Sequence, residues 1–176
     1  HKSVKIITRS AFEGCYNLVS IEMHDGVEII EQEAFRQCRS LRNIKLLGVR
    51  VIEYSAFFNC LSLVYVEFGD KLETIGLCAF NRCTSLRSIK LPTVRVIEFA
   101  AFASCDQLTE VELCKDLERI EGRAFKDCRR LRRIAVTLKD NLLDVDAFYQ
   151  CDDLSTVDLV GGIHKTVSSI LLESWR

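Results

Sequence analysis

The sequence predicts a solenoid of about seven stacked coils, of α/β class with mostly short, parallel β-strands and a capping helix after the last coil. Two observations carry this prediction: the dipeptide Ala-Phe recurs at steps of 22 or 23 residues, and a Cys follows each Phe after three residues. A repeat of this length forms one coil that buries its apolar face only against its neighbours. The repeated phenylalanines are Phe12, Phe35, Phe57, Phe80, Phe102, Phe125 and Phe148.

Each repeat contains three local patterns in chain order. A Val-x-x-Ile step ahead of Ala-Phe indicates a short extended segment, as at residues 27–30. The stretch Ala-Phe-x-x-Cys-x-x-Leu has three-residue spacing, which is typical of a tight helical or 3₁₀ turn. The Ile-x-Leu step that follows alternates with a period of two and predicts a short strand. Equivalent strands then pair in parallel at about 4.8 Å, which gives a stack about 35 Å long.

The whole unit, Val-x-x-Ile-x-x-x-Ala-Phe-x-x-Cys-x-x-Leu-x-x-Ile-x-Leu, resembles the BspA-like (treponemal-class) leucine-rich repeat over residues 4–160. The family pattern ends in a Pro that this chain keeps only at Pro92, so the turns after the other strands are expected to differ. The resemblance implies a leucine-rich-repeat solenoid of the kind found in bacterial surface proteins and in protists. It implies a non-catalytic protein-binding module. The alternative is a structural or self-assembling spacer.

Composition argues against several other classes of function. The 24 basic and 25 acidic residues leave a formal charge of −1, unlike a polycation built for nucleic acid or membrane surfaces. The three His are scattered, and we find no nucleophile–base pair and no phosphate-binding loop, so we expect neither an enzyme nor a cofactor. No segment approaches the roughly 20 apolar residues of a membrane span.

Seven of the nine cysteines occupy the repeat position, which predicts an inward row of small thiols. A straight row cannot converge on zinc, which needs four tetrahedral ligands, and parallel Cβ directions disfavour disulfides between coils. Cys78 and Cys114 lie outside the row and are expected to be the more reactive thiols. Abundant free thiols favour a reducing intracellular compartment.

Equivalent surface positions form rows in which neighbours lie about 5 Å apart. Two rows alternate in sign, which predicts ion pairs between coils and a module of two coils, 45 residues long: Glu22, Lys45, Glu67, Lys90, Glu112 and Glu28, Arg50, Glu73, Arg95, Glu118. A third row, directly after the inward Ile, is acidic at Glu31, Glu53, Glu98, Glu121 and Asp144. It is either a solvated turn with basic side chains leaning in or an acidic ridge that docks a basic protein. A linear row suits a divalent cation poorly.

Large apolar residues form a further candidate interface. Tyr54, Leu77 and Phe99 follow the inward Ile by two positions in consecutive repeats, and Tyr65 replaces a residue that is polar in most repeats. Apolar patches with aromatic side chains are typical centres of protein interfaces. The alternative is that the row packs into the turn.

A basic cluster in the sixth repeat is typical of a nucleic-acid patch when taken in isolation. Its register instead places Arg129 and Arg130 opposite Asp152 and Asp153, and Arg133 opposite Glu110, so nucleic acid is not the expected partner. The cluster consists of Lys126, Arg129, Arg130, Arg132 and Arg133.

Residues 1–160 are expected to form the solenoid, and residues 161–176 a capping helix over the last coil. Helical spacing of apolar residues indicates this helix, at Ile163, Val167, Ile170, Leu171 and Trp175. The first repeat has no cap, so end-to-end self-association is a further expectation. The absence of an initial Met and the abrupt end at Arg176 indicate a piece of a larger protein, whose targeting signal and partner the sequence does not identify.

Overall fold

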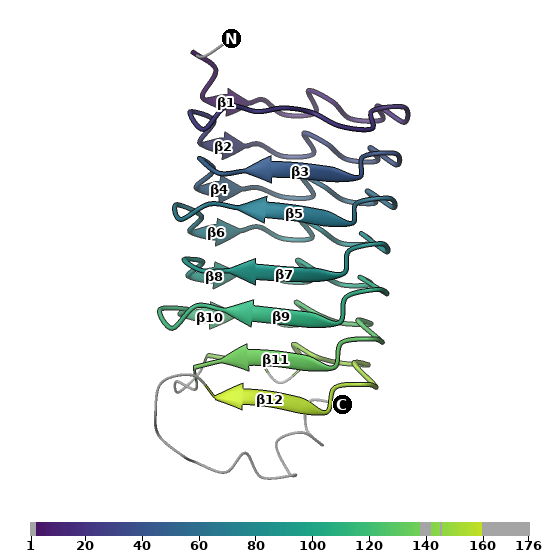
Figure 1. Cartoon of the computed structure of the whole chain (residues 1–176), viewed down its shortest axis with the longest axis vertical. Coiled ribbons are helices and arrows are strands. Elements are labelled where there is room, and N and C mark those ends of the chain that lie inside the picture. Colours follow the sequence, from purple (N-terminus) through teal and green to yellow (C-terminus); the bar gives the residue numbers. More distant parts are fainter. Residues whose placement is uncertain (1–2, 138–141, 145, 160–176) are drawn as a thin grey trace.

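The computed structural model describes residues 3–137, 142–144 and 146–159, which form a rod of stacked coils (Figure 1). We number the coils 1 to 7 by their Ala-Phe phenylalanine, from Phe12 in coil 1 to Phe148 in coil 7. The predicted parallel-strand solenoid is confirmed. The described residues form strands and turns and no helix, and the predicted capping helix at residues 161–176 lies outside them.

The Val-x-x-Ile steps form a continuous parallel sheet of two-residue strands on one side of the rod. Its strands are β1 (Ile6–Ile7), β2 (Ile29–Ile30), β4 (Val51–Ile52), β6 (Thr74–Ile75), β8 (Val96–Ile97) and β10 (Arg119–Ile120). The register places equivalent residues opposite each other, so that Ile52 pairs with Ile30 on one side and with Ile75 on the other.

The Ile-x-Leu steps form four-residue strands on the other side of the rod. They are β3 (Asn43–Leu46), β5 (Tyr65–Phe68), β7 (Ser88–Leu91), β9 (Glu110–Leu113), β11 (Arg133–Val136) and β12 (Thr156–Leu159). These strands do not form one sheet: β3 pairs with β5, and β7, β9, β11 and β12 form a second sheet. The space between β5 and β7 is visibly wider than that between the other long strands (Figure 1).

The Ala-Phe-x-x-Cys stretch forms a series of tight turns and not the helical or 3₁₀ turn that its spacing suggested. In coil 3 the amides of Ala56, Phe58 and Cys60 donate to carbonyl oxygens three residues back. The amides between them donate to coil 4, as Phe57 does to the carbonyl oxygen of Ala79 at 2.7 Å. The backbone has left-handed φ angles of 52° at Ser55 and 61° at Asn59, which interrupt a continuous helix and accompany the alternation of hydrogen bonds within the coil and to coil 4.

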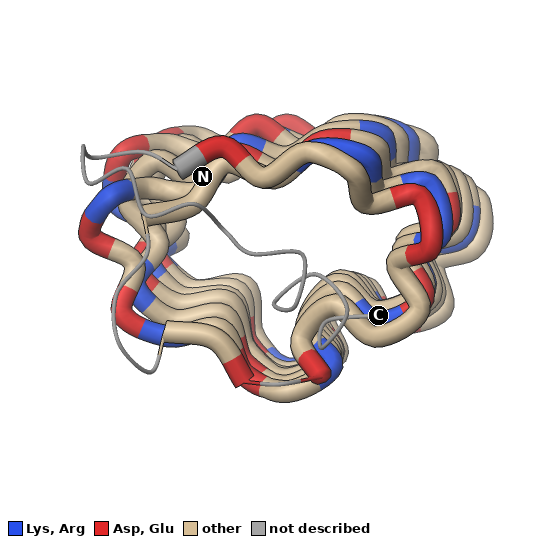
Figure 2. Tube along the Cα trace, turned by 90° about the horizontal axis from the view of Figure 1, so that it is seen from below, with Lys and Arg blue, Asp and Glu red and all other residues tan. Residues whose placement is uncertain are grey.

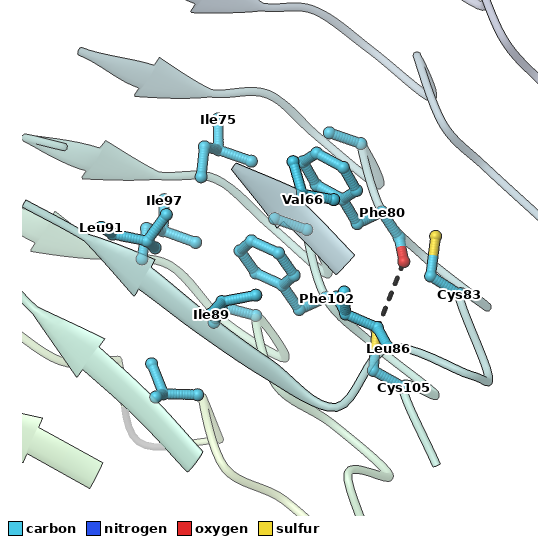
Figure 3. Close-up of a cluster of buried hydrophobic side chains, with 14 of the residues drawn as sticks. Val66, Ile75, Phe80, Cys83, Leu86, Ile89, Leu91, Ile97, Phe102 and Cys105 are labelled. Carbon is cyan, nitrogen blue, oxygen red and sulfur yellow. Dashed lines mark hydrogen bonds between the residues drawn. The ribbon is translucent and has the colours of Figure 1, made fainter. Parts of the chain in front are cut away.

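The phenylalanines stack ring on ring through the centre of the rod. Centroids of neighbouring rings lie 4.9–5.3 Å apart, with interplanar angles of 2–5°. Inward Ile, Leu and Val side chains surround the stack, as Ile75, Leu86 and Ile89 do around Phe80 and Phe102 (Figure 3). Viewed along the rod, the coils superimpose around this core (Figure 2). Residues on the outer face of each turn do not contribute to this core, so their identity can vary between coils.

Candidate binding surface

The predicted apolar row lies on the outside of coils 3, 4 and 5. Tyr54, Leu77 and Phe99 follow β4, β6 and β8 by two positions, and they are 43%, 37% and 39% exposed. We call these three residues the apolar ridge. Their exposure argues against the alternative that the row packs into the turn. The equivalent residues of coils 1, 2 and 6 are Arg9, Gln32 and Gly122.

The acidic row runs beside the apolar ridge, and its carboxylates cap backbone amides. Glu98 accepts a 2.8 Å hydrogen bond from the amide of Leu77 in the preceding coil, and Glu121 accepts a 3.0 Å bond from the amide of Phe99. Glu31, Glu53 and Asp144 accept the equivalent bonds from Arg9, Gln32 and Gly122. The row therefore has a structural role that the sequence did not reveal, because the donors are main-chain groups.

Coil 4 has no carboxylate in this row, because residue 76 is a glycine. The amide of Gly76 donates to the carbonyl oxygen of Ile52 at 2.7 Å, against 2.9 Å for the equivalent bond from Glu98 to Ile75. A Cβ at Gly76 would lie 2.8 Å from that Ile52 oxygen, so a side chain there requires the coils to move apart. The apolar ridge thus crosses the point at which the acidic row is interrupted.

Basic side chains lie at the C-terminal end of the ridge. The guanidinium carbon of Arg123 lies 5.7 Å from the centroid of the Phe99 ring, a distance at which a cation and an aromatic face attract. Arg119 lies 3.8 Å from Glu121 and 3.9 Å from Asp144. Basic side chains therefore lean toward the acidic row at this end, as the solvated-turn interpretation expected.

Tyr65 does not belong to the apolar ridge. It is the first residue of β5 and is 48% exposed, whereas the ridge follows the short strands, which lie behind the long strands in Figure 1. Tyr65 lines a groove of about 520 Å³ between β5 and β7, together with Phe68, Lys90 and Pro92. The structure therefore places the predicted apolar residues at two separate surfaces.

The alternating charged rows form ion pairs between neighbouring coils, always in the same order along the chain. In each pair a basic residue of one coil contacts an acidic residue of the next coil, at nitrogen–oxygen distances of 2.8–3.2 Å. The pairs are Lys5–Glu28, Lys45–Glu67, Arg50–Glu73, Lys90–Glu112 and Arg95–Glu118. The hydrogen bond and charge of Glu67 raise the pKa of Lys45. Figure 2 shows that charged residues gather at recurring positions around the rod. The ion pairs recur every second coil, in agreement with a module of two coils.

The row cysteines of coils 2–7 are buried, and each thiol donates to the carbonyl oxygen of the Ala-Phe phenylalanine in the preceding coil, at 3.1–3.4 Å. Burial raises the pKa of the Cys38 thiol to about 11, and it raises the pKa of Cys60 and Cys83 further. These thiols are structural, and their raised pKa values suppress the reactive thiolate form.

The expectation that Cys114 is reactive does not agree with the structure. Cys114 is only 8% exposed, and its thiol donates to the carbonyl oxygen of Val94 at 3.0 Å. Cys78 is half-buried, and burial raises its pKa. The exposed thiol is that of Cys15, a row member that belongs to the first described coil.

The basic cluster is largely engaged in pairs between coils. Arg133 contacts Glu110 at 2.9 Å, as its register predicted, and it also contacts Asp158. Arg132 lies 4.0 Å from Asp153. The predicted partners of two other residues are wrong: Arg130 donates to the side chain of Gln107, and Arg129 contacts Asp127.

Two further functions find no site in the described part of the chain. There, no group of three or more His, Cys, Asp or Glu residues is placed to hold a metal ion. The described residues also contain no helix that is long and apolar enough to cross a membrane.

Stacked parallel strands at one coil per 22 or 23 residues define a leucine-rich-repeat solenoid. The family described as BspA type leucine rich repeat region matches residues 5–132 and 85–173, in six copies. The chain therefore belongs to the BspA-type leucine-rich repeat family. Leucine-rich repeats generally mediate protein–protein interactions, and proteins of this kind are typically non-enzymatic. No match was found among curated proteins.

Solved bacterial structures have the same fold. The crystal structure of a leucine-rich repeat protein from T. pallidum is 30% identical, with a TM-score of 0.75, over 85% of this chain and 71% of that one. A leucine-rich repeat protein from Bacteroides ovatus is 29% identical, with a TM-score of 0.56, over 90% of this chain. A third, from Eubacterium ventriosum, is 23% identical with a TM-score of 0.67 over 82% of this chain, and shows the fold alone. The chain spans 53% of the B. ovatus protein and 44% of the E. ventriosum protein.

Proposed function

We propose that the chain is a non-catalytic protein-binding module whose docking surface centres on the apolar ridge. The observation that carries the proposal is the exposure of Tyr54, Leu77 and Phe99 in three consecutive coils, at a position where coils 1, 2 and 6 have polar residues or glycine. Interfaces concentrate their binding energy in a few such side chains, with aromatic residues enriched among them. The core does not require these residues, because the inward positions of the same coils are already filled.

The charge around the ridge defines the chemistry of the partner. Glu53, Glu98 and Glu121 cap backbone amides beside the ridge, so acidic side chains form a margin along it. Successive coils lie about 5 Å apart, so the ridge is about 10 Å long. An extended segment that presents two or three apolar side chains, flanked by Lys or Arg, complements this surface in length and in charge.

Selection from a displayed peptide library tests the proposal even while the natural partner is unidentified. Peptides selected on the wild-type chain are expected to be apolar with flanking basic residues. They are expected to lose at least about tenfold in affinity for a chain with Tyr54→Ser, Leu77→Ser and Phe99→Ser, the effect of removing central interface residues.

The matched control replaces three tyrosines outside the ridge that are somewhat more exposed than the ridge residues, in the variant with Tyr16→Ser, Tyr65→Ser and Tyr149→Ser. It is expected to keep wild-type affinity. Equal affinity for the ridge variant and the wild type, with both folded by circular dichroism, would overturn the proposal. Sedimentation of each protein without peptide measures its oligomeric state. Peptide binding by a chain that sediments as a monomer shows that binding at the ridge does not require self-association.

A further inference from the structure

Coils 3 and 4 are spaced differently on the two sides of the rod. On the short-strand side β4 and β6 remain paired, Ile52 with Ile75. On the long-strand side β5 and β7 belong to separate sheets, and the wider space between them is visible in Figure 1. Coils 5 and 6 differ in this respect, because their short strands β8 and β10 and their long strands β9 and β11 are both paired.

Gly76 allows a close approach on the short-strand side. Its amide lies 2.7 Å from the carbonyl oxygen of Ile52, the shortest of the equivalent bonds, which otherwise measure 2.9–3.1 Å. The same carbonyl oxygen lies 2.8 Å from the place that a Cβ would occupy. This is tighter than any ordinary Cβ contact, so the contact depends on glycine.

Phe68 holds the long-strand side open. It occupies the last position of the Ile-x-Leu step, where the other described coils from 2 to 6 have Leu46, Leu91, Leu113 and Val136, all 1–4% exposed. Phe68 is larger and only half-buried, and its ring meets the ring of Phe80 edge-on, with centroids 5.9 Å apart. Core packing has little spare volume, so the extra ring displaces β5 from β7.

Glu67 and Lys90 carry opposite charges on the two sides of the opening but do not form an ion pair with each other. Glu67 of β5 pairs with Lys45 of β3 at 3.1 Å, and Lys90 of β7 pairs with Glu112 of β9 at 3.0 Å. Each of these two ion pairs therefore lies within its own sheet. The groove of about 520 Å³ lies between these two pairs and is lined by residues of β5, β7 and β9.

We infer that coils 3 and 4 form a flexion joint, with its hinge at Gly76 and its opening at Phe68. The rod divides there into coils 1–3 and coils 4–7, which rotate about the short-strand side as the groove opens and closes. The apolar ridge crosses the joint, because Tyr54 belongs to coil 3 and Leu77 to coil 4. The ridge lies on the hinge side, directly after the short strands, so flexion changes its spacing much less than the width of the groove, and the joint itself does not depend on the proposed binding function.

Amide hydrogen exchange on the wild-type chain, resolved by residue, tests the joint directly. The amides of β7 that face β5 are expected to exchange at least about tenfold faster than the β9 amides that face β7, although both strands lie inside the stack. Equal protection of the two sets would overturn the inference. This comparison needs no variant, so it stands even where a substitution prevents folding.

Two substitutions of the same kind add a matched test. Phe68→Leu restores the side chain of the other coils and is expected to slow exchange of the β7 amides that face β5 toward the β9 rate. Phe58→Leu removes the same atoms from a half-buried side chain in the turn of the same coil and is expected to leave those amides unchanged. Unchanged exchange in Phe68→Leu, or an equal response in Phe58→Leu, would contradict the role of Phe68 as the residue that holds the groove open.

Discussion

The thiol of Cys105 donates a 3.4 Å hydrogen bond to the main-chain carbonyl oxygen of Phe80 in the preceding coil (Figure 3). The bond recurs between coils along the stack and explains why the repeat uses cysteine at this position. The site is closed and apolar, so it suits a small side chain, and the carbonyl oxygen favours a weak donor. Alanine lacks the donor, and serine adds a more polar group to the same space.

Replacing a buried row cysteine should destabilise the solenoid more than replacing the exposed one. For Cys105→Ala we expect a loss of about 1–3 kcal/mol in the free energy of unfolding, from the small cavity and the lost hydrogen bond together. Cys15→Ala removes the same atoms at an exposed position and should change stability by less than about 0.5 kcal/mol. Urea unfolding under reducing conditions measures the free energy of unfolding of both variants. Equal losses would contradict a stabilising role for the buried, hydrogen-bonded thiol.

Stability should fall at alkaline pH because the folded chain holds its thiols protonated. Burial raises the pKa of Cys38 from 9.0 to about 11, and other row thiols shift in the same direction. The unfolded chain thus loses protons that the folded chain keeps, so the stability is complete below about pH 9 and declines above it. Each such thiol contributes about 1.4 kcal/mol per pH unit to the decline. Urea unfolding between about pH 8 and pH 10 measures the slope, which Cys83→Ser should make shallower; a flat profile would contradict the raised pKa values.

The close contact at Gly76 should make it the glycine least tolerant of substitution along the apolar ridge. Gly76→Ala places a Cβ against the Ile52 carbonyl oxygen, and we expect a cost of about 1–3 kcal/mol. Gly122→Ala is the control, because its one close contact within 3.0 Å would be with the flexible end of the Asp146 side chain at 2.8 Å, and its contact with the Phe99 ring at 3.6 Å is an ordinary van der Waals contact. Thermal unfolding compares the two, and a Gly76→Ala chain as stable as Gly122→Ala would mean that coils 3 and 4 are not held close at this point.

Replacing Glu by Gln in the acidic row separates the effect of its charge from the effect of its hydrogen bonds to backbone amides. Glu98→Gln with Glu121→Gln keeps an acceptor oxygen for the amides of Leu77 and Phe99 but removes both charges. We expect near-wild-type stability, and weaker binding of basic ligands at low salt that converges with wild type at about 1 M salt. Titration of a selected basic peptide at both salt concentrations is the measurement. Salt-independent affinity would exclude a role for the acidic row in recognition.

The sequence predicts the repeated part of the structure well, because periodicity identifies most inward positions of coils 2–7, whereas the row member Cys15 in coil 1 is exposed. The expected positions of Phe57, Cys60 and Ile75 in the core all hold. Hydrogen bonds between side chains and main-chain atoms could not be predicted from the sequence, because main-chain groups are the same in every residue. Examples are the bond from the Leu77 amide to Glu98 and the bond from the Cys105 thiol to the Phe80 carbonyl oxygen.

The remaining differences come from residues that depart from the repeat. Phe68 and Gly76 stand out in the sequence, but only the structure shows that β5 and β7 lie in separate sheets beside Phe68 and that Gly76 lies at a close contact between two coils. Tyr65 and Tyr54 lie close in the chain and on different sides of the rod. Cys114 interrupts the pattern, yet the chain path after β9 buries it against Val94.

The footprint of a bound ligand tests the central claim most directly. Hydrogen exchange of the chain with and without a library-selected peptide maps that footprint at the level of coils. We predict protection confined to the turns that follow β4, β6 and β8, centred on Tyr54, Leu77 and Phe99. Protection of the long strands β7 and β9 instead, with the turns of coils 3–5 unchanged, would contradict the apolar ridge as the docking surface.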